Sequence, residues 1–473
     1  MRFTSFGFIF VFLPGAVWLF RHTGERARLR LWVALALSVL FYSINAFADL
    51  PVIGLSIVGN ALAARGVMRC PAPWRGRALG VAVAANLAGL AFYKYAGALG
   101  LPMVRPDLPL GISYFTFTQI AFLVDVCRGR ANLVDGLEYA VFVGWFPHLS
   151  AGPLLAPQQM LPQLTAAKAQ PADQHDIAVG LLLFTVGLFK KTTLAPLYVS
   201  AEGSVFVRIG HGDAVGLVET WLSCLAYFVE LYLDFSGYSD MALGVSRMFG
   251  IHLPVNFHAP FRSSSIIEFW TRWHITLGRF MRDYVYTPLT RKRQTGRHYA
   301  ALFVVMLAVA VWHGATVPLL GFGLFHGFLV AANHAGRRWG LIRRQGSAWQ
   351  GWLGRVVTLL SITFSISLWR APDWGVAWRT VLGLTGSGGA PAGLFNPSYA
   401  AGLLITIAVT WTLPSVIDLL AAELPPWSLP TRVRQFGFAA WRPSWLWVIV
   451  TAGLLAVAIA NIPDAVGFRY AEF

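Results

Sequence analysis

The sequence predicts an all-α polytopic membrane protein with about 11 transmembrane helices plus re-entrant half-helices. The first observation behind this prediction is composition, because the 473-residue chain is 56% hydrophobic and 12% charged, with a mean hydropathy of +0.59. A soluble core of this size could not bury so much apolar surface. The second observation is segment length, because apolar runs of roughly 17 to 25 residues, enough for a helix to cross the hydrocarbon, recur along the chain.

Each apolar run is predicted to be a helix, because a backbone inside the hydrocarbon must satisfy its own hydrogen bonds. The first run ends directly at Arg21 and lacks a small-residue cleavage site, so we expect a permanent span rather than a signal peptide. No internal repeat is evident, and one membrane domain over residues 1–473 is the economical interpretation. The predicted spans lie at residues 3–20, 31–48, 50–64, 78–97, 177–197, 217–234, 299–315, 317–336, 352–369, 399–419 and 444–462.

Two shorter apolar pieces, at residues 109–127 and 136–155, are interrupted by residues that break helices. This pattern favours re-entrant or buried half-helices over complete spans. The interrupting residues are Pro109, Gly111, Pro147, Gly152 and Pro153.

The formal charge of +16 comes from 37 Lys and Arg residues against 21 Asp and Glu residues. In a soluble protein it would suggest nucleic acid, but here membrane topology explains it and no nucleic-acid partner is expected. Short basic loops on one face predict a cytoplasmic side, with the amino terminus outside. The opposite face includes residues 372–400, whose Gly-rich part is predicted to be a flexible extracytoplasmic loop. The basic loops are residues 21–30, 65–77, 128–130, 291–297, 337–344 and 432–442.

Several common chemistries have no sequence signal. Cys70, Cys127 and Cys224 are too scattered for a disulfide framework, and no metal-binding spacing occurs, so we expect no metal and no permanently bound cofactor. The chain also lacks a nucleophile elbow, a phosphate-binding loop and a dinucleotide fingerprint. Asp234 and Asp240, in DFSGYSD, are interpreted as capping and orienting residues in a Gly-containing turn between helices, with a serine triad as the minor alternative.

His313 is the single imidazole in the apolar run AALFVVMLAVAVWHGA, residues 300–315. An ionisable side chain in such a segment is costly, so it is interpreted as a reacting group that faces a polar cavity. Apolar surroundings favour the neutral ring, which can accept a proton from a hydroxyl. We therefore expect His313 to act as a general base, a role that typically contributes about 10²- to 10⁴-fold to a rate.

Residues 230–289 hold acids, histidines, arginines and aromatics that lipid would not tolerate. Within them Glu268, Arg272 and His274 are predicted on a helix entered through a serine cap, with Glu268 and Arg272 as i,i+4 neighbours. For His274 two interpretations stay open: a catalytic partner of His313, or a structural histidine beside a self-neutralising ion pair.

The basic residues between the two histidines also allow two interpretations. They form a solvated positive-inside loop, or they capture a phosphorylated cytoplasmic donor, because guanidinium suits phosphate geometry. Lys190 and Lys191 are expected to reach the membrane interface, with an anionic head group as the alternative. The candidate substrate- or donor-binding residues are Trp270, Trp273, Arg279, Arg282, Asp283, Tyr284, Trp312, Asp234, Asp240, Lys190 and Lys191.

Six ordered segments resemble the membrane-bound O-acyltransferase family, in the bacterial polysaccharide branch that includes the membrane subunit of alginate O-acetylation. The resemblance covers about residues 3–370, and the closing FRYAEF (468–473) is also similar to that branch. A single W-H-G would not be specific, whereas the ordered series is. The segments are PLGISYFTFTQIAFLVDV (109–126), FPHLSAGPLL (146–155), GLFKK (187–191), LDFSGYSDMALG (233–244), residues 254–289 and VWHGAT (311–316).

The resemblance implies helices around a central tunnel, where a donor funnel meets an acceptor funnel. It implies that His313 and His274 are the catalytic histidines. It places a family core at residues 3–340, with a catalytic region at 230–335, and C-terminal helices at 341–473. The implied location is a bacterial inner membrane, so the lipid bilayer is the protein's surroundings.

The resulting hypothesis is an acetyltransferase that uses acetyl-CoA as its donor substrate. The acceptor is a hydroxyl of an extracytoplasmic polysaccharide, reached directly or through a periplasmic acetyltransferase partner. One alternative keeps the enzyme and replaces the donor by an acyl carrier protein, as in D-alanyl transfer. A second class is a proton-coupled transporter, and a third is a structural membrane anchor.

Overall fold

The computed structural model describes residues 1–24, 26–101, 107–164, 172–198, 205–291, 294–342, 347–389, 397–429 and 440–462. All regular structure in these residues is helical. The amino-terminal part contains η1 (Phe8–Phe12), α1 (Leu13–Arg21), α2 (Ala27–Ala46), η2 (Phe47–Asp49), α3 (Leu50–Arg69), α4 (Ala72–Tyr95), α5 (Ile112–Cys127), α6 (Gly136–Gly144), α7 (Phe146–Leu149) and α8 (Pro157–Leu164).

The central part runs from α9 (Gln174–Phe189) through η3 (Lys190–Leu194), η4 (Ala195–Tyr198), α10 (Val205–His211), α11 (Leu217–Met248), η5 (Pro260–Arg262), α12 (Ile266–Trp270), α13 (Ile275–Phe280), η6 (Met281–Tyr286), α14 (Thr287–Leu289) and α15 (Thr295–His313) to α16 (Val317–Arg338). The remaining helices are α17 (Ala348–Trp369), α18 (Trp374–Thr385), α19 (Pro397–Thr412), α20 (Val416–Leu419) and α21 (Trp445–Ala460).

Seven candidate membrane spans occur in the described part of the chain, each long and apolar enough to cross a bilayer. One of them, Ala27–Arg69, comprises α2, η2 and α3, and its backbone bends at Ala46. The protein is therefore a multi-pass membrane protein, although the count of about 11 is not confirmed. The apolar helices Phe8–Arg21, Ile112–Cys127 and Trp445–Ala460 are shorter than a full span.

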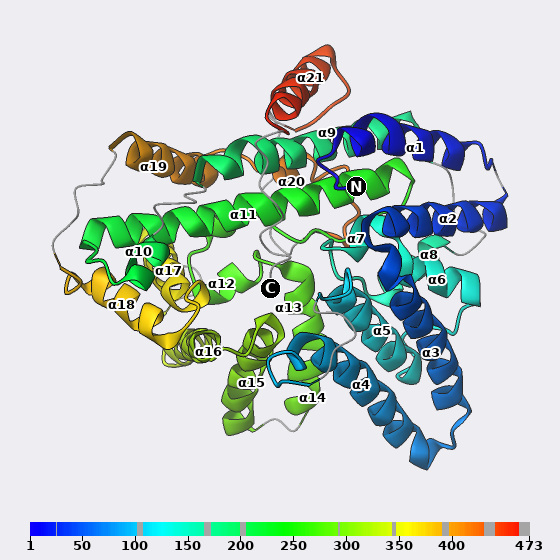
Figure 1. Cartoon of the computed structure of the whole chain (residues 1–473), viewed down its shortest axis with the longest axis horizontal. Helices are drawn as coiled ribbons and strands as arrows, with labels where there is room; N and C mark the ends of the chain where they lie inside the picture. Colours follow the sequence, from blue (N-terminus) through cyan, green and yellow to red (C-terminus); the bar gives the residue numbers. More distant parts are fainter. Residues whose placement is uncertain are drawn as a thin grey trace.

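Helices α9 and α11 lie alongside each other across the middle of the molecule (Figure 1). Glycines make this close approach possible. A Cβ on Gly187 would lie 2.4 Å from the carbonyl oxygen of Gly237, and a Cβ on Gly244 would lie 2.4 Å from that of Gly180. Small residues that let helix backbones touch are a common way for membrane helices to associate. Around this pair, Figure 1 shows α1 and α2 at one end of α11 and α10, α17 and α18 at the other.

One expectation about local structure is corrected. The DFSGYSD segment is not a turn, because residues 234–240 lie inside the 32-residue helix α11. Residues 112–127 form a buried helix shorter than a full span, as the interrupted pattern predicts, and Gly111 lies just before it with a φ of 72°. In the stretch 372–400, α18 precedes the Gly-rich part, and residues 386–389 lie outside helices as predicted. Residues 390–396 and 468–473 are outside the described residues.

Candidate active site

The segment that carries His274 is a short helix followed by a sharp change of direction. Ser265 caps α12, its side chain accepting a hydrogen bond from the Glu268 amide at 3.2 Å, as the serine run predicts. The helix ends at Trp270, so the expected continuous helix through His274 is wrong. His274 instead has a φ of 42°, in the left-handed region that side chains other than glycine rarely adopt.

Asn256 holds His274 in this conformation. The backbone carbonyl of Asn256 accepts a hydrogen bond from the Ile275 amide at 2.9 Å, and the side-chain Oδ1 of Asn256 accepts one from the Thr276 amide at 3.3 Å. Oδ1 also lies 3.1 Å from Nδ1 of His274. The Thr276 amide can only donate, so the Asn256 side-chain atom that it contacts is the accepting oxygen. His274 Nδ1 must therefore donate to this oxygen, which makes Nδ1 the protonated nitrogen of the neutral ring. The Nε2 of His274 then carries the lone pair that a base requires.

His313 is the last residue of α15 and is 6% exposed. Its ring lies 4.3 Å from that of Trp312 and 4.5 Å from that of Trp369, between centroids. Trp312 in turn lies 6.2 Å from the ring of His274. The Lys94 ammonium donates a hydrogen bond to the Trp312 carbonyl, which ties α4 to the end of α15.

The two histidines line one cavity of about 40 Å³, which we call the histidine cavity. The structure therefore brings together the two residues that the sequence singled out for catalysis. Trp270 and Trp273 line the same cavity, as does a third histidine, His326 of α16. The remaining lining is apolar, from Phe228, Leu231, Phe269, Leu277, Val309, Phe322, Ile362, Ile366 and Trp369.

A second cavity, of about 390 Å³, shares His274, Trp270, Leu277 and Val309 with the first. We call it the arginine cavity, because Arg279 and Arg282 lie in its wall with His334, Tyr286 and apolar residues. Arg282 is exposed, so the cavity reaches the molecular surface there. The two cavities therefore adjoin at His274. The arginine cavity is basic at its mouth, and the histidine cavity is mainly apolar.

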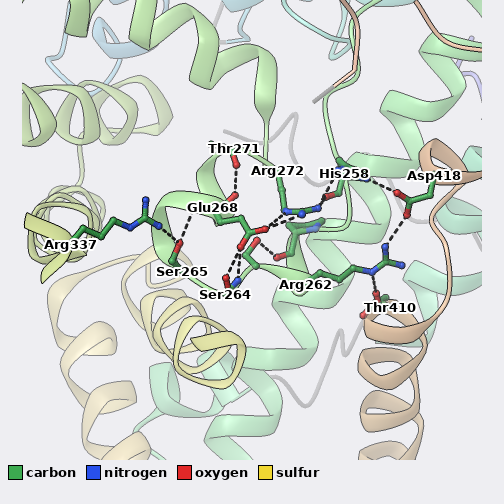
Figure 2. Close-up of polar contacts among 12 residues, drawn as sticks. His258, Arg262, Ser264, Ser265, Glu268, Thr271, Arg272, Arg337, Thr410 and Asp418 are labelled. Atoms are coloured by element: carbon green, nitrogen blue, oxygen red, sulfur yellow. Dashed lines mark hydrogen bonds and ion pairs between the residues drawn. The ribbon is translucent and has the colours of Figure 1, made fainter. Parts of the chain in front are cut away.

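A chain of hydrogen-bonded polar side chains, which we call the His258 latch, fixes the loop before His274 to the C-terminal helices (Figure 2). His258 Nε2 lies 2.8 Å from Oδ1 of Asp418, in α20, and Asp418 Oδ2 pairs with Arg262 at 2.8 Å. The other nitrogen of His258 lies 3.2 Å from Nη1 of Arg272, which pairs with Glu268 at 2.9 Å. The predicted i,i+4 pair is confirmed, and it is one link of this latch.

Glu268 is held in its charged form by this arrangement. Partial burial acts to raise the pKa of Glu268, but hydrogen bonds from Ser264 and the charge of Arg272 outweigh it and lower the pKa below its ordinary value. The Ser264 amide donates to the carboxylate at 2.9 Å, and its hydroxyl at 2.8 Å. Figure 2 shows Arg337 of α16 reaching the Ser265 hydroxyl, at 3.1 Å, on the far side of the same turn.

Other predicted binding residues lie away from the two cavities. Lys190 pairs with Asp240 at 2.6 Å, and Lys191 pairs with Asp234, all in the contact between η3 and α11. Their ammonium groups therefore do not extend to the interface as expected, because buried carboxylates are available. Asp283 pairs with Arg282 at 2.8 Å, and Tyr284 donates to Asp125 at 2.7 Å. Neither Asp283 nor Tyr284 lines the histidine cavity or the arginine cavity. Lys292 and Arg293 lie outside the described residues.

Sequence reasoning missed two residues of this site. His326 carries the signal that identified His313, an imidazole inside an apolar run, here residues 317–336. Asn256 lies in the resembling segment PVNF, but no residue spacing shows that its side chain meets His274 across the turn.

Comparison with known proteins agrees with this geometry. Residues 126–369 match MBOAT, the membrane-bound O-acyltransferase family. This is a protein class built for acyl transfer in membranes, and the chain belongs to it and is an O-acyltransferase. The finding favours an enzyme over the transporter and the structural anchor.

The relatives share the same general activity. The chain is 32% identical over 429 residues to the peptidoglycan O-acetyltransferase of Helicobacter pylori, covering 81% of this chain and 79% of that protein. It is 36% identical over 404 residues to a Pseudomonas aeruginosa protein named "Probable alginate O-acetylase AlgI", covering 80% and 74%. It is 30% identical over 247 residues to the teichoic acid D-alanyltransferase of Bacillus subtilis, covering 49% and 60%.

Proposed function

We propose that this protein moves an acetyl group from cytoplasmic acetyl-CoA to a hydroxyl of an extracytoplasmic polysaccharide, directly or through a periplasmic acetyltransferase partner. The observation that carries the proposal is the meeting of the two cavities at His274, with His313 in the inner one. The names of the two acetylating relatives support acetyl as the group transferred and a cell-surface polymer as the acceptor.

The chemistry is a transesterification of a thioester. The acceptor oxygen attacks the thioester carbonyl carbon, so that a C–O bond forms and the C–S bond breaks. The proton of the acceptor hydroxyl is transferred to the sulfur of the leaving CoA, which departs as the free thiol. His313 takes the proton from the acceptor hydroxyl as general base. His274, with Nδ1–H bound to Asn256 and its lone pair on Nε2, orients the acceptor or relays the proton to the thiolate.

The arginine cavity suits the donor. Arg279 and Arg282 supply guanidinium groups at its mouth for the phosphates of CoA. Its inner wall is apolar up to His274, which suits the uncharged arm that carries the thioester. In this orientation the basic mouth faces the cytoplasm, in accord with the positive-inside rule.

A second donor has one observation in its favour, the partial match to a D-alanyltransferase. An acyl carrier protein would dock on the basic face and deliver its thioester by the same route. The two donors can be distinguished by supplying each to the purified enzyme, because only the true donor will be consumed during acyl transfer.

The test uses purified protein in lipid nanodiscs with labelled acetyl-CoA and a bacterial cell-surface polysaccharide. Acetyl-dependent release of CoA, with label in the polymer, is expected from the wild type. His313→Ala should lower the transfer about 10²- to 10⁴-fold, while His22→Ala, at an exposed imidazole in the turn after α1, should retain it. Unchanged transfer by His313→Ala would overturn the catalytic assignment, and absence of CoA release by the wild type would overturn acetyl-CoA as donor.

A further inference from the structure

His326 is a buried polar residue that the fold leaves unsatisfied. It is 1% exposed, and neither ring nitrogen has a hydrogen-bond partner among the described residues. Its ring contacts are aromatic, with Phe322 at 4.3 Å and Trp270 at 5.2 Å between centroids. An apolar side chain at this position would avoid the cost of burying two polar atoms without partners.

Trp270 presents a second unsatisfied group next to it. Its indole Nε1 is also buried without a partner among the described residues. The Trp270 and His326 rings meet at an interplanar angle of 80°, and both line the histidine cavity with His313 and His274. An indole N–H can only donate, and a neutral imidazole has one N–H donor, so Trp270 and His326 together have two N–H groups without an acceptor among the described residues.

The size of the histidine cavity bears on which group can bring an oxygen to these donors. The histidine cavity measures about 40 Å³, whereas the adjoining arginine cavity measures about 390 Å³. The smaller space suits a short acyl group better than a long one, and Phe322 and Ile366 in its wall limit the chain length that fits.

We propose that the histidine cavity holds the transferred acyl group, that Trp270 and His326 donate hydrogen bonds to its carbonyl oxygen, and that its small size selects short acyl chains. This inference rests on the proposed function and assigns a binding site to that reaction. The carbonyl oxygen gains negative charge as the hydroxyl adds, and N–H donors in a water-excluded site stabilise that charge.

The first experiment separates this role from a structural one by measuring two properties of His326→Leu. Removal of the two unsatisfied nitrogens should raise the thermal unfolding temperature in detergent, while kcat for acetyl transfer should fall about 10²-fold, the typical effect of one lost oxyanion donor. His326→Gln, whose amide can still donate, should recover part of the rate. Phe328→Leu, at a residue of the same helix that is 61% exposed, is the control.

Trp270→Phe tests the second donor, because it keeps the aromatic packing and deletes the N–H. It should lower kcat in the same direction as His326→Leu with a smaller effect on KM. If both variants transfer acetyl at the wild-type rate, the hydrogen-bonding role is overturned.

The second experiment measures selectivity with acetyl-, propionyl-, butyryl- and octanoyl-CoA. The wild type should prefer acetyl-CoA. Ile366→Ala enlarges the cavity and should raise the butyryl-to-acetyl ratio of kcat/KM about tenfold. An unchanged ratio in a folded Ile366→Ala variant would overturn the acyl site although transfer continues. Absence of transfer from every donor in the wild type would instead overturn the proposed function.

Discussion

The contact between η3 and α11 and the histidine cavity both bury polar side chains, but two buried groups in each region differ in their partners. In the η3–α11 contact, Lys190 and Lys191 each pair with a carboxylate of α11. In the cavity, His326 and Trp270 keep polar atoms without partners in the described structure. Because an unsatisfied polar group costs stability and a paired one much less, the first region is scaffold and the second is kept for a ligand.

The largest expected effect tests the scaffold side of this comparison. Asp234→Asn removes the carboxylate that pairs with the buried Lys191 ammonium, and breaking a buried ion pair typically costs about 3 to 5 kcal/mol. Chemical or thermal unfolding in detergent measures the loss. The double variant Lys191→Met with Asp234→Leu should recover most of the stability and retain acyl transfer. A folded double variant that cannot transfer would place the pair in the reaction instead.

The next effect concerns the positioning of His274. Asn256→Ala frees the ring to adopt either tautomer and loosens the left-handed turn, and a small misplacement of a catalytic group can cost about 10²-fold. We expect the loss in kcat rather than KM, together with a changed pH–rate profile. Ser239→Ala is the matched control, because Asn256 Nδ2 donates to that hydroxyl at 3.3 Å on the side away from His274. Equal losses in both variants would make Asn256 a packing residue only.

A smaller effect tests the close helix contact. Gly187→Ala would place a Cβ 2.4 Å from the Gly237 carbonyl oxygen and 2.7 Å from the Met241 amide, both rigid backbone atoms. We expect a loss of about 1 to 3 kcal/mol in unfolding free energy. Gly89→Ala in α4 meets nothing within 4 Å and should be neutral or slightly stabilising. Equal effects of the two substitutions would show that the helices separate easily.

The smallest effect comes from the partly exposed end of the His258 latch. The folded-state pKa of Glu268 is lowered, so its contribution to stability is complete above the unfolded carboxylate pKa of about 4.3 and disappears as the pH falls through the lower folded value. Stability of the wild type should therefore decline below that pH more steeply than that of Glu268→Gln. If the wild type and Glu268→Gln lost stability equally as the pH falls, the lowered folded-state pKa of Glu268 would be contradicted.

The sequence predicted what depends on local pattern. Apolar runs located α15, α16 and α17 within a few residues, and the serine run located the cap of α12. It failed where distant segments decide the outcome. DFSGYSD was interpreted as a turn because Gly and Asp favour turns. In the structure Gly237 packs against α9, and the two aspartates pair with the lysines of η3, which favours a continuous helix.

The same distinction applies to the site. An imidazole in an apolar run identified His313, and the family resemblance added His274, yet the partners of these residues come from segments far away in sequence. Asn256 and Asp418 are ordinary polar residues until the fold places them beside His274 and His258. Side-chain pairing across the fold has no periodicity that a single sequence can display.

The His258 latch has a consequence for folding. Asp418 and the Thr410 carbonyl, which accepts a hydrogen bond from Arg262 at 2.9 Å, lie later in the chain than both catalytic histidines. The loop that aims His274 is therefore secured only once α19 and α20 have packed against it. A variant truncated before α19 would contain both catalytic imidazoles and lack the anchor that orients one of them.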